Sequence, residues 1–154
     1  MPHIHLLQGI IGAILLKHFN LGNSSMIWFI IGSISPDFDI LYGYITKQNH
    51  RNFITHYPIT WLSIGCFFGI MGFSVFWFFV GAFIHILIDL IDWEIYILAP
   101  LSIVSFSLLK LDYKKMIEGG SIVDFLLGYY RNKSVVFIEA GIVFFFAFIF
   151  MNFL

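Results

Sequence analysis

The sequence contains very little charge. Of its 154 residues, 8 are Lys or Arg and 9 are Asp or Glu, whereas 60% are apolar and 20% are aromatic. A soluble domain of this composition would lack the polar surface needed to cover itself, so we expect a membrane protein. The net charge of −1 provides no basic face that would neutralise phosphates, so nucleic acid is not an expected partner.

Cysteine is also nearly absent. Cys66 is the single cysteine and lies in an apolar run, which excludes a disulfide framework and a cysteine zinc site. We expect Cys66 to be a small buried apolar residue. The sequence has no repeat and no stretch rich in Pro, Ser or charge between apolar segments, so we predict a single domain over residues 1–154.

The first apolar run is short enough to be mistaken for a signal peptide. No Lys or Arg precedes it, no A-x-A-like cleavage site follows it, and it begins with His3 and His5. We therefore expect this segment to be retained.

Long apolar runs predict an all-α, polytopic membrane protein with about five or six apolar helices. Residues 57–92 would be roughly 54 Å long as one helix, which exceeds the bilayer, so we expect a hairpin with its turn near residues 69–74. The other expected segments are residues 4–19, residues 26–45 bent or ended by Pro36, a partial or re-entrant helix over residues 95–109, and a last spanning helix over residues 134–154.

Charge placement gives an expectation for orientation in the cell membrane. With alternating helices, one face receives six basic residues and the other, which holds the N-terminus, receives only Lys47 and Arg51. Because loops rich in Lys and Arg stay in the cytoplasm, the second face is expected to be extracytoplasmic. The six are Lys17, Lys110, Lys114, Lys115, Arg131 and Lys133.

Ionisable groups inside apolar helices are costly unless they meet a partner, water or a metal ion. They occur at five places, of which the first four are expected at the same membrane face. The places are His3 and His5; Asp37 and Asp39; His50, Arg51, Thr55 and His56; His85, Asp89 and Asp92; and Glu139.

The spacing of His85, Asp89 and Asp92 places all three on one side of a helix. Such side chains can bind one ion or bridge two, although His and Asp can also satisfy each other as a buried hydrogen-bonded pair. Asp37 and Asp39 can likewise converge on a cation, or act as a helix cap and a solvated acid.

Together these places predict a metal site. Carboxylates brought beside Asp89 would repel unless a proton or a cation intervened, and histidines at the same level complete the mixed nitrogen and oxygen shell that zinc, manganese and iron prefer.

Four motifs occur in the order "HLLQG", "PDFD", "HRNFITH" and "HILID" over roughly residues 1–100. This order resembles the LexA-binding, inner-membrane-bound metal-dependent hydrolase family, which looks distantly similar to the zinc-dependent phospholipase C and P1 nuclease group. Tyr57 stands where many members have a serine, and "DWEI" replaces a Thr-Pro-x-Gly-like turn, so the pocket and the substrate differ from the pattern. The ligands that the resemblance implies are His5, Asp37, Asp39, His56, His85 and Asp89.

The resemblance implies a multi-pass inner-membrane hydrolase holding two or three divalent metal ions, zinc or alternatively manganese or iron. We expect it to cleave a phosphoester of a membrane lipid or lipid-linked substrate, and no sequence feature identifies a protein partner. The catalytic candidates are His50, as ligand or acid, Arg51, as phosphate contact, and Asp92. Arg51 can instead meet lipid headgroups or pair with Asp37.

Three other functions fit the same residues: acyl or amide hydrolysis at the same metal site, an ion or proton carrier that uses buried Asp and His, and a scaffold that keeps the ligands for structure. Glu139 in the last helix either braces a ligand histidine or pairs with a polar residue of a neighbouring helix.

Overall fold

The computed structural model is all-helical in the residues that it describes, which are 2–46, 52–109 and 127–153. Over these ranges the only strand-like pairing is an isolated bridge between Ile95 and Phe106. The all-α prediction is therefore confirmed. The elements are α1 (Pro2–His18), α2 (Asn23–Ile34), η1 (Ser35–Asp39), α3 (Ile40–Thr46), η3 (Ile54–His56), α4 (Pro58–Ile70), α5 (Phe76–Asp92) and α8 (Lys133–Phe153).

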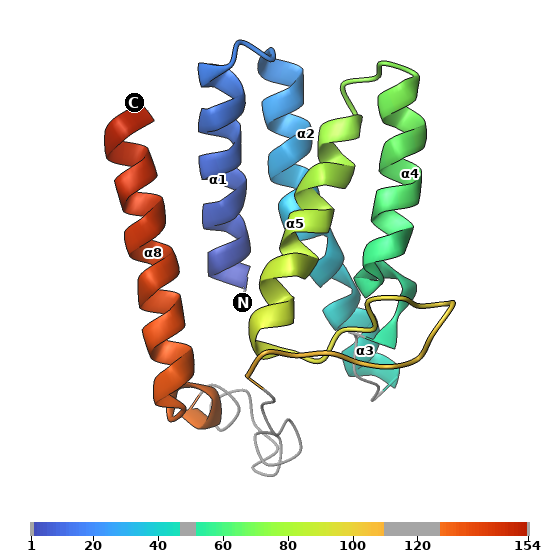
Figure 1. Cartoon of the computed structure of the whole chain (residues 1–154), viewed down its shortest axis with the longest axis vertical. Coiled ribbons are helices and arrows are strands. Elements are labelled where there is room, and N and C mark those ends of the chain that lie inside the picture. The colour runs from blue at the N-terminus through green and yellow to red at the C-terminus, as the bar shows by residue number, and fades with distance from the viewer. Residues whose placement is uncertain (1, 47–51, 110–126, 154) are drawn as a thin grey trace.

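The long helices stand side by side (Figure 1). α2 packs against α1 and α5, α4 packs against α5, and α8 lies along α1. The beginning of α1, the end of α2, the beginning of α4, the end of α5 and the beginning of α8 all lie at the same end of the bundle, which we call the site end. The topology thus brings residues far apart in sequence to one level.

Two predicted helix boundaries are confirmed. α2 ends at Ile34, and Pro36 lies in the 3-10 turn η1 that follows, because proline has no N–H to donate and its ring clashes with the preceding helical turn. Between α4 and α5 the chain turns at residues 71–75, where Gly72 has φ 72°, a conformation that glycine adopts without strain. The turn at residues 71–75 therefore joins α4 and α5 into the predicted hairpin.

Residues 95–109 were predicted as a partial helix, and this is wrong. They form turns and a loop closed by Ile95 and Phe106, whose backbone N–H groups each donate to the other's carbonyl oxygen at 2.9 Å. Pro100 lies inside this loop and prevents a continuous helical ladder.

The predicted burial of Cys66 is also wrong, because its side chain is exposed on α4. α4 is apolar on all sides, and Leu62 and Phe67 on it are exposed as well. In a membrane protein an apolar side chain can face lipid, so apolarity alone does not indicate which face of such a helix is packed.

α8 is the one helix among the described residues that is long and apolar enough to cross a membrane. Lys133–Asn152 contains an 18-residue window with a mean hydropathy of 2.4, and 6% of that window is buried inside the protein. α1 and α5 have 17 residues each, and α2 and α4 have 12 and 13. The expectation of five or six spanning helices therefore stays a prediction.

Glycines allow α2 and α5 to approach each other closely. A Cβ atom on Gly32 would lie 2.0 Å from the carbonyl oxygen of Phe78, and one on Gly81 would lie 2.4 Å from that of Phe29. Small residues at helix interfaces permit such backbone contact. The contact places the C-terminal end of α2 beside the part of α5 that carries His85.

We predict that Gly32→Ala destabilises the protein by about 1–3 kcal/mol, because its methyl group would overpack the contact between α2 and α5. Thermal unfolding of the detergent-solubilised protein, followed by circular dichroism, should show a lower Tm. Gly141→Ala on α8 is the matched control, since nothing lies within 4 Å of its Cβ position. An unchanged Tm for both variants would contradict a tight interface at Gly32.

Candidate metal centre

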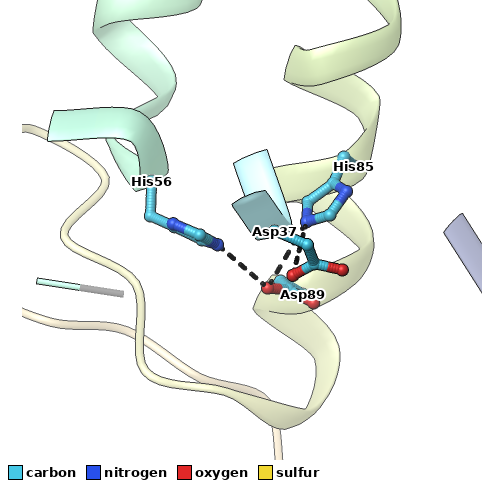
Figure 2. Close-up of side chains that lie close together, drawn as sticks. All are labelled: Asp37, His56, His85 and Asp89. Atoms are coloured by element: carbon cyan, nitrogen blue, oxygen red, sulfur yellow. Dashed lines mark ion pairs between the residues drawn. The ribbon is translucent and has the colours of Figure 1, made fainter. Parts of the chain in front are cut away.

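Four predicted ligands come together at the site end. Asp37 is supplied by η1, His56 by η3, and His85 and Asp89 by α5 (Figure 2). One ligand atom from each residue lies within 4.8 Å of the other three. Both histidines and Asp89 are buried, while the Asp37 side chain is 11% exposed. We call these four residues the metal cluster.

The separations within the metal cluster suit a shared cation better than hydrogen bonds. His56 Nε2 lies 3.7 Å from Asp89 Oδ2, and His85 Nε2 lies 3.6 Å from Asp37 Oδ1 and 3.9 Å from Asp89 Oδ2 (Figure 2). A hydrogen bond from nitrogen to oxygen is ordinarily shorter than about 3.2 Å. Around a tetrahedral zinc with bonds of about 2.0 Å, neighbouring ligand atoms are roughly 3.3 Å apart, which is close to these distances.

Both cluster histidines are held with Nε2 toward the carboxylates. His85 Nδ1 donates to the carbonyl oxygen of Ser33 at 2.7 Å, and His56 Nδ1 donates to Asp39 Oδ2 at 3.0 Å. A neutral imidazole with its proton on Nδ1 presents a lone pair at Nε2. Metal-bound histidines are usually oriented in this way, with the second ring nitrogen donating to a carbonyl or a carboxylate.

Buried polar atoms without a hydrogen-bond partner indicate whether the metal cluster suits a cation. Among the described residues, no hydrogen-bond partner is found for His85 Nε2 or for either carboxylate oxygen of Asp37, although all three atoms are buried. Buried polar atoms are normally paired, and adjacent carboxylates normally require a cation or a proton between them. A divalent cation would meet both needs, and the two nitrogen and two oxygen ligands suit zinc, manganese or iron.

His5 and Asp39 lie directly behind the metal cluster. His5 Nε2 is 3.0 Å from Asp89 Oδ1, and its ring stacks on that of His85 with centroids 3.5 Å apart. Asp39 accepts hydrogen bonds from His56 and from the hydroxyl group of Thr55. Each therefore fixes the position of a cluster residue, and direct ligation of a metal ion by either stays a prediction.

The simpler arrangements of the separate motifs are not observed among the described residues. His85 and Asp89 do not hydrogen-bond each other at 3.9 Å, so they are not the simple buried pair. Asp37 and Asp39 are mostly buried and face histidines, which disfavours a cap with a solvated acid.

The three catalytic candidates are placed differently. His50 and Arg51 lie outside the described residues. Asp92 lies less than one turn beyond Asp89 and accepts a hydrogen bond from the hydroxyl group of Tyr129, so it is not among the four cluster residues. Its catalytic role stays a prediction.

Sequence reasoning missed Ser33 and Tyr129. Ser33 acts through its backbone carbonyl, for which no side-chain pattern exists. Tyr129 follows the polar segment at residues 110–126 with no periodic signal to mark it.

Comparison with known proteins identifies one family. A family model described as YdjM inner membrane protein matches residues 1–154. No curated protein and no solved structure matches the chain. The distant similarity to the phospholipase C and P1 nuclease group stays a prediction.

We expect the purified protein to bind a divalent metal ion, measurable by inductively coupled plasma mass spectrometry. His85→Ala and Asp37→Asn should lose the ion because each removes a cluster ligand. Asp39→Ala should weaken the affinity about 10–100-fold, since His56 would lose the acceptor that orients it.

Glu94→Gln is the matched control, because this exposed carboxylate contacts Ser105 and lies outside the metal cluster. Wild-type metal affinity in His85→Ala would contradict the assignment of these residues as metal ligands. A wild-type protein that binds no zinc, manganese or iron would contradict it as well.

Proposed function

The chain belongs to the YdjM inner membrane protein family, and from this premise we propose that it is a metal-dependent hydrolase of the membrane. Its substrate is the phosphoester of a lipid or of a lipid-linked compound. The observation that supports this proposal is the metal cluster, in which two imidazoles and two carboxylates from three separate elements converge within 4.8 Å.

The surroundings of the metal cluster favour a lipid substrate. Phe38, between the two acids of η1, is 70% exposed, and Ile54, two residues before His56, is 62% exposed. Exposed apolar side chains beside a polar site suit contact with acyl chains while the cluster meets the headgroup. A lipid is also already concentrated and oriented at the membrane surface.

The metal, when bound, would supply positive charge to a phosphoryl oxygen and lower the pKa of a coordinated water. The protein's own part is to hold the ligands in place. Asp39 and the Ser33 carbonyl orient the two cluster histidines, while His5 braces Asp89 and stacks on His85.

Arg51 and His50 lie outside the described residues, and we propose a role for each from the sequence. The planar guanidinium group of Arg51 suits a phosphoryl group, and it precedes Asn52 and the segment that carries His56. His50 would serve as an additional ligand or as the acid for the leaving oxygen.

An ion or proton carrier is the main alternative function for the same buried residues. A carrier needs polar groups through the depth of the membrane, whereas α2 and α4 contain no charged residue and the metal cluster lies at one end of the bundle. This distribution favours the enzyme.

We predict that purified protein in lipid or detergent releases phosphate or a phosphorylated headgroup from a panel of phospholipids and lipid-linked phosphates. A chelator should abolish the release, and added zinc or manganese should restore it. Asp37→Ala should reduce turnover by about 100-fold or more, a larger loss than that typical of a residue behind the ligands.

Glu94→Gln should retain wild-type turnover in this assay. Metal-dependent release of fatty acid with no phosphoester cleavage would instead support acyl hydrolysis. Ion flux into vesicles without any hydrolysis would support the carrier.

A further inference from the structure

A second polar group lies beside the metal cluster and has no part in it. The phenolic oxygen of Tyr129, which precedes α8, contacts Asp92 at the end of α5 and Glu139 of α8. We call these three residues the Tyr129 group. Tyr129 is fully buried, and its ring stacks on Trp93 with centroids 5.8 Å apart. The phenol is therefore fixed in place between two acids.

The Tyr129 phenol contacts both acids of the group. It donates its one proton to Asp92 Oδ2, and its oxygen also lies 3.3 Å from Glu139 Oε1. Glu139 has a further side-chain hydrogen bond with Tyr130. The phenol therefore lies between two carboxyl groups that can each exchange a proton with it.

The Tyr129 phenol keeps its proton at rest. Burial raises the pKa of this phenol, and the neighbouring Asp92 and Glu139 raise it further.

A small cavity joins the Tyr129 group to the metal centre. Its volume is about 20 Å³, enough for roughly one water molecule. Asp92, Tyr129 and Glu139 line it together with His5 and Asp89, and its other lining residues are apolar. A water molecule held in this cavity would link the two groups.

The far side of the Tyr129 group reaches the protein surface. Glu139 Oε2 lies 3.9 Å from His3 Nε2, and the His3 side chain is 56% exposed. The titratable groups that face the Tyr129 group within the described residues are His3 and His5 of α1, Asp89 of α5, and Tyr130.

We propose that Asp92, Tyr129 and Glu139 form a proton relay between the metal centre and the surface. A proton that leaves the centre through the cavity protonates Asp92. Asp92 then donates this proton to the phenolic oxygen while the phenol passes its own proton to Glu139. Glu139 releases the proton to solvent on the His3 side, which restores the starting state. The outward direction rests on the proposed function, because phosphoester hydrolysis releases a proton near neutral pH.

Infrared spectroscopy tests the contact between Tyr129 and Glu139 without any assay of activity. Glu139→Gln should remove the carboxyl band of Glu139 and so identify this band in the wild-type spectrum. Tyr129→Phe should shift the same band, because Glu139 loses its contact with the phenolic hydroxyl group. A Glu139 band that is unchanged in Tyr129→Phe would overturn the proposal.

Turnover tests the relay itself. Tyr129→Phe keeps the ring against Trp93 but removes the hydroxyl, so turnover should fall about 10-fold or more while the metal content stays at the wild-type level. Added imidazole buffer, which can carry protons, should restore part of the loss, whereas it would not repair a purely structural defect.

Tyr42→Phe, which alters an exposed tyrosine on α3, is the matched control and should keep wild-type turnover. Full turnover in Tyr129→Phe would overturn the relay and leave the hydrolase intact. A Glu139 band that shifts in Tyr129→Phe, in a protein that hydrolyses nothing, would support the contact of the relay residues and refute the proposed function.

Discussion

The repulsion between Asp37 and Asp89 is the constraint on which the site end depends. Their facing oxygens lie within 4.8 Å, and two unit charges at this distance repel by about 3.5 kcal/mol at the effective dielectric constant of about 20 that describes protein sites. A cation held jointly with His56 and His85 would turn the repulsion into attraction, and metal binding would then be coupled to the folding of η1 and η3 onto α5.

This convergence requires contacts made far from the acids themselves. Gly32 and Gly81 let α2 and α5 meet at backbone distance, and the carbonyl of Ser33, one residue after Gly32, consequently reaches His85. Pro36 then ends the helical path, so the chain leaves α2 as a 3-10 turn that directs Asp37 and Asp39 toward the histidines. The geometry of the metal cluster is thus a property of helix packing, and the ligands themselves only complete it.

These facts explain which features the sequence could predict. Pro36 and the glycines near residue 70 are local signals, and the helix boundaries that they predicted are confirmed. The meeting of Asp37, His56, His85 and Asp89 followed from counting helices and from the cost of unpaired charge in an apolar chain. The prediction that Cys66 is buried was wrong because α4 is apolar on every side, so its sequence contains no information about which face is packed. The contact of His5 with Asp89, which joins residues 84 positions apart, has no local signal that would separate a ligand from a bracing residue.

The position of Asp89 and Asp92 on α5 connects the two polar groups at the site end. Residues three apart on a helix are neighbours that diverge by about 60°, so their side chains lie close together and still face different partners. Asp89 belongs to the metal cluster, Asp92 contacts Tyr129, and both line the same small cavity. The histidines and carboxylates of a metal centre must lose protons to bind a cation. A carboxyl group on the same helical turn, linked through a fixed phenol to the exposed side of His3, would give such a centre a route for these protons.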